Sequence, residues 1–286
     1  MKSFVKILLF VALNFIVNNS FAKSLIGESC VQDCDISGSI IDEGEYKNFS
    51  FAYSDQEDLT FTNVIFEKSK FNNATFENLK IINSEFLKSS FDVSDISGAE
   101  FIDSKFTKST FAYSDLSEST FLNSDFEDTK MNNSDISEVS MDNVILDESN
   151  LSVVEMEEST ITNSSLIDIE FSYSKISDSK LQSIDFDECK CNNSEFKDSI
   201  ITDISSLDSN FDVSDFYKSK IENSNFKESS FKYANFKKTE LKNINFDEID
   251  ANNINFSKSN FLDVTFIESE LSVSDFSNSK LENVNF

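Results

Sequence analysis

The sequence predicts an all-β fold in which the chain winds into a solenoid of about 12 four-sided coils of 20 residues. Two observations predict it. A large apolar residue recurs at every fifth position from Ile36 to Phe286 without a slip of register, and a small or β-branched residue usually stands two positions earlier. A helix turns by about 100° per residue and a strand alternates its faces, so neither keeps a five-residue repeat on one side. The chain must therefore bend every five residues, and four such sides close one square coil.

The stretch 211–246 shows the repeat most clearly, with Phe, Ile or Leu at every central position. Inward steps of two and then three residues fit a short extended side followed by a corner. The 31 Phe residues supply a continuous core, because coils about 4.8 Å apart suit offset aromatic stacking. We expect one elongated domain over residues 36–286. The central positions that depart from Phe, Leu, Ile or Met are Tyr46, Gln56, Cys191, Ser206 and Ala251.

The five-residue motif resembles the consensus of the pentapeptide-repeat family: a small residue, Asp or Asn, a central Leu or Phe, and two freer positions. Ser-Asp-Phe at 124–126 and 214–216, Ser-Asn-Phe at 224–226 and Ala-Asn-Phe at 234–236 match this consensus directly. The resemblance extends over about residues 36–286 and implies a right-handed quadrilateral β-helix. It implies little about function, because one fold hosts many roles.

Residues 1–22 have the pattern of a secretory signal peptide. Lys2 and Lys6 give a positive start, an apolar stretch follows at 7–17, and Ser20-Phe21-Ala22 forms a small-x-small cleavage site. We expect cleavage after Ala22 and export to the periplasm, the cell surface or the medium. The alternative is an uncleaved membrane anchor. A standard span needs about 20 apolar residues, whereas this core is shorter and contains Asn14.

The four cysteines fall into two pairs. Cys30 and Cys34 lie in a segment, 23–35, that we expect to cap the first coil, and in an exported protein we expect them to form a local disulfide. Two unpaired thiols are the alternative. Cys189 and Cys191 both fall on inward positions, about 6.6 Å apart if extended, which is awkward for a bridge, so we expect small core residues. The chain has no His, and we expect no metal site and no cofactor.

Side chains 20 residues apart are expected to stack into columns along the exterior. One column, which begins at Asn63 and Asn83 and ends at Asn283, is mostly Asn, and we interpret it as structural. The column on the opposite side cycles through Tyr, Asn and Val every 60 residues, beginning at Tyr53. This cycle indicates duplication of a 60-residue block.

Two further columns carry charge, and the longer acidic run is the candidate partner-facing surface. We call this run, which follows Lys68, Lys88 and Lys108 in its column, the acidic ladder; its members are Asp128, Glu148, Asp168, Glu188, Asp208, Glu228, Glu248 and Glu268. The opposite column runs from Glu118 to Asp198 and continues with lysines from Lys218. Like charges about 5 Å apart repel by up to about 1 kcal/mol in water. The acidic ladder therefore has three interpretations: a solvated face, a cation-binding ladder, or a docking face for a basic protein.

The last coil is the candidate site of a homodimer. Its in-phase apolar residues would expose apolar area and strand edges at the end of a solenoid, which demands a cap or a partner. We expect end-to-end pairing through Leu271, Phe276, Leu281 and Phe286.

These features predict an exported, non-enzymatic β-solenoid that acts as a rigid acidic scaffold for an unknown protein partner. The net charge of −28 and the lack of basic patches argue against direct binding of nucleic acid. No Gly-rich phosphate loop or nucleophile motif points to an enzyme. The resemblance implies one alternative, a cytoplasmic mimic of DNA that binds a type II topoisomerase, and a rod about 60 Å long permits it. A cation-binding surface protein is the other alternative.

Overall fold

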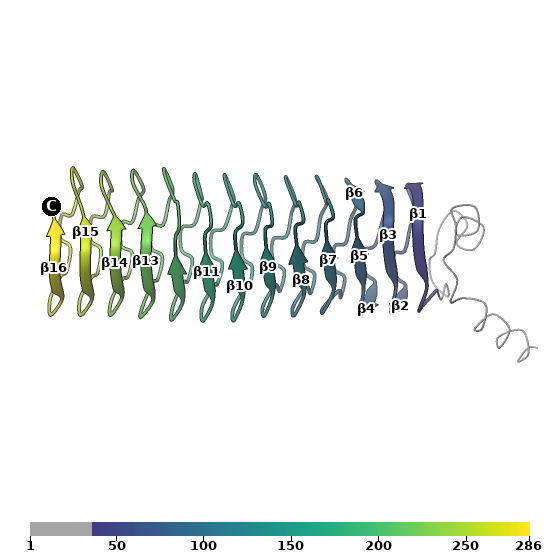
Figure 1. Cartoon of the computed structure of the whole chain (residues 1–286), viewed down its shortest axis with the longest axis horizontal. Coiled ribbons are helices and arrows are strands. Elements are labelled where there is room, and N and C mark those ends of the chain that lie inside the picture. The colour runs from purple at the N-terminus through teal and green to yellow at the C-terminus, as the bar shows by residue number, and fades with distance from the viewer. Residues whose placement is uncertain (1–35) are drawn as a thin grey trace, which may run out of the picture.

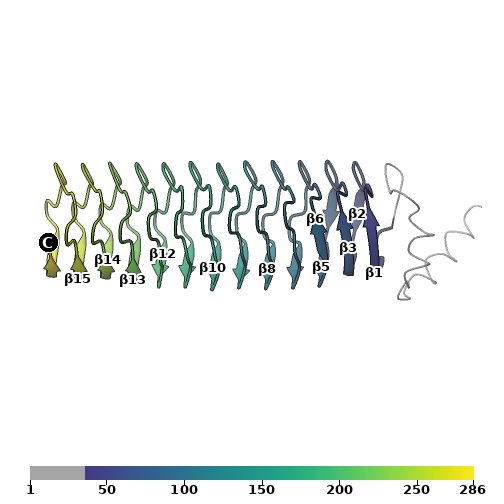
Figure 2. The same cartoon turned by 90° about the horizontal axis from the view of Figure 1, so that it is seen from above.

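The protein is a straight parallel β-solenoid of about 12 coils, which confirms the predicted fold class (Figures 1 and 2). The structure, a computed structural model, describes residues 36–286. Helices are absent from this range, so it holds none that could span a membrane. The predicted right-handed winding stays a prediction. The predicted signal peptide at 1–22, the cap at 23–35 and the Cys30–Cys34 pair lie outside the described residues.

Sixteen short strands form the sides of the coils in the described range. Most strands have three residues. The last four strands, β13 to β16, have six residues because they continue over a corner. In chain order they are β1 Ile40–Lys47, β2 Asp55–Glu57, β3 Thr60–Glu67, β4 Thr75–Glu77, β5 Lys80–Ile82, β6 Glu85–Leu87, β7 Glu100–Ile102, β8 Thr120–Leu122, β9 Ser140–Asp142, β10 Thr160–Thr162, β11 Lys180–Gln182, β12 Ile200–Thr202, β13 Lys220–Asn225, β14 Glu240–Asn245, β15 Asn260–Thr265 and β16 Lys280–Asn285.

All strand pairs are parallel and join residues 20 apart. The large sheet has the order β1-β3-β5-β7, then β8 to β16 in sequence, with β6 also paired to β3, while β2 and β4 form a separate pair. Ile161 thus lies opposite Leu181, and isolated bridges such as Ser90 to Thr110 keep the same step on other sides of the coil. The unbroken register means that each exterior column is a real row of neighbours.

A corner follows every central residue by two positions, and almost every corner residue has a positive φ. Asn, Asp and Gly adopt this left-handed conformation most readily. In the Asn-rich column the side-chain amides also bond from coil to coil: Asn83 Nδ2 donates to Asn63 Oδ1 over 2.6 Å, and Asn143 Nδ2 to Asn123 Oδ1 over 3.0 Å. This confirms that the column is structural.

The central positions form the core, as the five-residue repeat predicts. Phe rings 20 residues apart stack almost parallel: the Phe91 and Phe111 centroids are 4.6 Å apart at an interplanar angle of 5°. The departures are buried too, and Gln56 Oε1 accepts the Ile36 N–H at 2.9 Å. Ser206 is also fully buried, but unlike the Gln56 side chain its hydroxyl has no hydrogen-bond partner among the described residues.

Serine two positions before the central residue has a specific role in this backbone. The Ser114 hydroxyl donates to the Phe91 carbonyl at 2.7 Å and accepts the Ser94 N–H at 3.2 Å. Both backbone groups belong to the preceding coil and are buried. The small side chain thus supplies hydrogen bonds that the short strands do not make, which explains the serine preference at this position.

The prediction that Cys189 and Cys191 are not bridged is wrong, because they form a disulfide. Their Cα atoms are 5.5 Å apart, well within the range that a bridge requires and shorter than the fully extended spacing of about 6.6 Å. The side of the coil is short and bends at both ends, so the chain between them is less extended than an ideal strand. Both residues are buried in the core, as predicted.

Candidate functional site: the acidic ladder

The structure brings all eight members of the acidic ladder to one corner of the solenoid. Each has a positive φ, between 50° and 62°, so each side chain leaves the backbone at the same point of its coil. Backbone bonds join successive rungs: the Glu148 N–H donates to the Ile167 carbonyl at 2.9 Å and the Glu188 N–H to the Leu207 carbonyl at 2.8 Å. The register therefore holds the carboxylates in one row about 4.8 Å apart.

The ladder is exposed, and only part of its charge is compensated within residues 36–286. Asp128 is half-buried and the other seven members are exposed. Lys108 Nζ lies 3.4 Å from an Asp128 oxygen, and Lys190 Nζ lies 3.9 Å from Asp168. Four members form no ion pair in the described part of the chain; they are Glu148, Glu188, Asp208 and Glu268.

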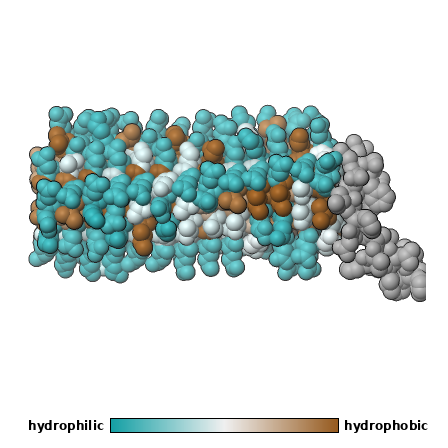
Figure 3. Space-filling model, in the orientation of Figure 1, coloured by the Kyte–Doolittle hydropathy of each residue, from teal (hydrophilic) through white to brown (hydrophobic). Residues whose placement is uncertain are grey.

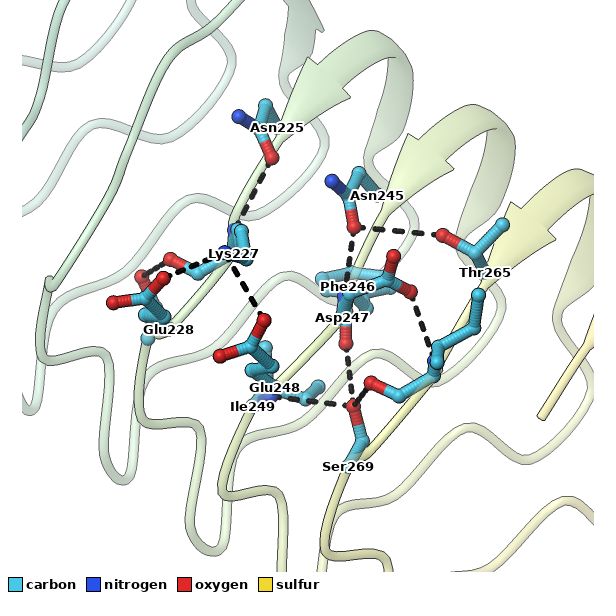
Figure 4. A network of polar contacts seen from close by, with 12 residues as sticks. Asn225, Lys227, Glu228, Asn245, Phe246, Asp247, Glu248, Ile249, Thr265 and Ser269 are labelled. Atoms are coloured by element: carbon cyan, nitrogen blue, oxygen red, sulfur yellow. Dashed lines mark hydrogen bonds and ion pairs between the residues drawn. The ribbon is translucent and has the colours of Figure 1, made fainter.

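Lys227 bridges two rungs of the ladder (Figure 4). Its Nζ lies 2.7 Å from Glu228 Oε1 and 3.0 Å from Glu248 Oε1. Hydrogen bonds to Glu228 first and Glu248 second raise the pKa of the Lys227 ammonium above its ordinary value.

Acidic side chains on the adjoining side, one residue before the ladder, serve the backbone instead. Asp147 Oδ1 accepts the Ile167 N–H at 3.0 Å, and Asp187 Oδ1 accepts the Leu207 N–H at 2.7 Å. Burial raises the pKa of the nearby Asp185 carboxyl, and the Asp187 carboxylate adds to the rise. Sequence reasoning missed this role, although its signal is an Asp one position after the central residue.

The opposite charged column is shorter and partly neutralised at its basic end. Lys218 Nζ lies 3.3 Å from Asp198, and Lys238 Nζ donates to the Tyr217 hydroxyl at 2.8 Å. Its acidic part, Glu118 to Asp198, spans fewer coils than the acidic ladder does. Over residues 36–286, no group of three or more Cys, Asp or Glu side chains has the geometry to hold a metal ion.

The candidate dimer end is less buried than the rest of the core. Leu271 and Phe276 are partly buried against the core, whereas Leu281 is 46% exposed and Phe286 is 61% exposed. Phe286 still stacks on Phe266 with the ring centroids 5.4 Å apart. An end-to-end homodimer through these side chains stays a prediction.

Two family comparisons decide which repeat this is. The family described as "Pentapeptide repeat region" matches residues 207–276, and the family described as "Pentapeptide repeats (8 copies)" matches residues 111–147. These two segments of the chain carry pentapeptide repeats. The matched segments include the Ser-Asp-Phe and Ala-Asn-Phe motifs at 124–126, 214–216 and 234–236.

Several solved structures are similar to this chain. HetL, involved in heterocyst differentiation regulation in the cyanobacterium Nostoc sp. strain PCC 7120, is 12% identical with a TM-score of 0.40, covering 84% of this chain and 88% of HetL. A trypsin-treated form of QnrB1, a plasmid-mediated fluoroquinolone resistance protein, is 14% identical with a TM-score of 0.38, covering 67% of this chain and 90% of that one. Among curated proteins, none matches the chain. At these identities and TM-scores, neither match supports a conclusion about this chain.

Proposed function

We propose that this protein is an exported, non-enzymatic, rigid scaffold that docks a basic protein partner on the acidic ladder. One observation carries the proposal: eight consecutive coils place a carboxylate at the same exposed corner, and half of these carboxylates lack an ion pair within residues 36–286. Adjacent rungs repel by up to about 1 kcal/mol in water. A partner with basic side chains at matching spacing relieves this repulsion and gains charge complementarity.

The rigidity of the rod supports this role. The coils stack in a straight line (Figure 1), and the pairing of residues 20 apart holds the ladder at fixed spacing. Binding of a partner therefore costs little conformational entropy in the ladder backbone. The face seen in Figure 3 is largely hydrophilic with scattered apolar residues, which suits a solvated docking surface.

Two observations support export. The first residues have the signal-peptide pattern, with the small-x-small site at 20–22. The buried Cys189–Cys191 disulfide is a second, since disulfides persist in oxidising compartments and are rare in the cytosol. Cell fractionation followed by a blot tests this part: a shortened product outside the cytoplasm is expected. An unprocessed cytoplasmic product would contradict export and favour the topoisomerase-binding alternative.

Docking is tested with poly-L-lysine as a basic probe, by calorimetric titration at low and moderate salt. The ladder variant carries four substitutions at rungs without an ion pair: Glu148→Gln, Glu188→Gln, Asp208→Asn and Glu268→Gln. Its matched control removes the same charge from the opposite column: Glu118→Gln, Glu138→Gln, Glu158→Gln and Asp178→Asn. We expect the ladder variant to bind several-fold more weakly than the control. Equal weakening would mean that net charge alone attracts the probe, and docking on the ladder would be rejected.

A further inference from the structure

The 60-residue blocks that begin at residues 51, 111, 171 and 231 have diverged over most of their exterior but not at one corner. The outward-facing positions are those that flank a central residue or lie at a corner. Four of these positions hold the same residue in all four blocks. They are a Tyr, two adjacent Asn and a Val. The residues are Tyr53, Tyr113, Tyr173 and Tyr233; Asn72, Asn73, Asn132, Asn133, Asn192, Asn193, Asn252 and Asn253; and Val93, Val153, Val213 and Val273.

All these residues lie along the same edge of the solenoid, which we call the Tyr–Asn–Val ridge. Backbone bonds join its successive coils: the Tyr53 N–H donates to the Asn72 carbonyl at 3.2 Å, and the Val93 N–H donates to the Ala112 carbonyl at 3.0 Å. The Tyr side chains are 63–64% exposed and the Val side chains 48–83% exposed. The ridge therefore presents its identical residues to solvent rather than to the core.

Local backbone preference does not explain why Tyr and Val persist here. The four Tyr have φ between 59° and 61°, and the four Val have φ between 60° and 63°. This left-handed region favours Asn, Asp and Gly, and a β-branched residue in it is strained. Exposed Val gains little from burial in return. Duplication accounts for the 60-residue period, but neighbouring exterior positions have changed since, so these side chains serve contacts outside the chain.

The chemistry of the ridge selects an uncharged ligand. None of its identical positions is charged, although the chain as a whole carries a net charge of −28. Tyr rings and Val methyls offer rigid apolar surface, and the amides and phenol hydroxyls offer hydrogen-bond donors and acceptors. Of the eight Asn side chains, only Asn252 makes a side-chain hydrogen bond with other residues in the described range. Sugar rings, with apolar C–H faces and hydroxyl edges, match this combination.

The period of the ridge selects a polymer. Three coils of about 4.8 Å place equivalent Tyr residues about 14 Å apart in four successive stations along the rod axis. Equally spaced identical stations suit a ligand made of repeating units, and several weak contacts on one chain add up through avidity. We propose that the Tyr–Asn–Val ridge binds a linear, uncharged polysaccharide lying along the rod. This surface is separate from the acidic ladder.

Co-sedimentation of the processed full-length protein with insoluble cellulose, chitin and β-1,3-glucan tests the proposal. The test variant replaces the four ridge tyrosines by Asn, which favours the corner conformation and so keeps the fold. The control introduces Asn at four positions of another corner and so removes four negative charges: Glu118→Asn, Glu138→Asn, Glu158→Asn and Asp178→Asn. We expect the wild type and the control to pellet with at least one polysaccharide, and the tyrosine variant to lose at least tenfold in affinity.

Two outcomes would overturn the proposal. Wild-type protein that stays in the supernatant with all three polysaccharides is one, and a tyrosine variant that binds as well as the wild type is the other. Light scattering on the same samples tests the other possible occupant of the ridge, a second copy of the chain. A dimer that the tyrosine substitutions abolish, without any pelleting, would reject the polysaccharide and assign the ridge to a second copy of the chain.

Discussion

The serine hydroxyls that join successive coils give the sharpest test of how this solenoid is held together. Ser114→Ala removes one hydroxyl that serves two buried backbone groups, the Phe91 carbonyl at 2.7 Å and the Ser94 N–H at 3.2 Å. An orphaned buried polar group costs about 1–3 kcal/mol. Ala234 occupies the position that Ser114 has in its own coil, and Ser214 corresponds there to Ser94. The Ser214 N–H donates to the Phe211 carbonyl at 3.1 Å, so an alanine at this position leaves the backbone groups partly bonded. We therefore expect a loss of about 2 kcal/mol in total.

Ser206→Ala is the matched control, because this serine is equally buried but its hydroxyl has no partner among residues 36–286. Its removal is expected to be neutral or to stabilise by up to about 1 kcal/mol. Thermal unfolding followed by far-UV circular dichroism measures both. At about 2–4 °C per kcal/mol, Ser114→Ala lowers Tm by roughly 4–8 °C while Ser206→Ala does not. Equal losses in the two variants would refute the idea that these hydroxyls act through the backbone groups they bond.

Three further outcomes follow from the packing and the charges. Phe91→Ala leaves a gap between Phe71 and Phe111, stacked on it at 4.5 and 4.6 Å, and should cost about 3–5 kcal/mol in urea denaturation; a loss below about 1 kcal/mol would contradict the stacked core. Burial raises the pKa of the Asp185 carboxyl in the folded protein above its value in the unfolded chain. The fold therefore loses stability as the pH rises from the unfolded pKa to the folded pKa, and this loss persists at higher pH. Asp185→Asn should therefore raise Tm at pH 7 but not at pH 3, and an equal gain at both would exclude this cause. Raising NaCl to about 0.5 M should raise Tm by screening the acidic ladder, less so in the four-rung variant; identical salt responses would argue against repulsion within the ladder.

The fold was predictable from the sequence because its rule is local and repeats without a slip. One apolar residue in every five, from Ile36 onward, is compatible with neither a helix nor a flat strand, and the bend it forces leads to coils of 20 residues. The same rule placed the acidic ladder on one column, since columns follow from coil length alone. The Asn column was predictable in the same way, and its side-chain bonds are present.

Other features depended on distances that periodicity does not contain. The Cys189–Cys191 bridge depends on how far a short side departs from full extension, which shortens the Cα spacing to 5.5 Å. Which rungs of the ladder keep a free charge depends on where long Lys side chains reach, as Lys227 does between Glu228 and Glu248. The Tyr–Asn–Val cycle could be interpreted only from the φ angles and the exposed fractions of its side chains. These show that the Val residues are strained and exposed to solvent. Sequence by itself determined the coil and its columns, since both follow from spacing along the chain. Tertiary structure decided bonding, exposure and strain, because these depend on atoms from neighbouring coils.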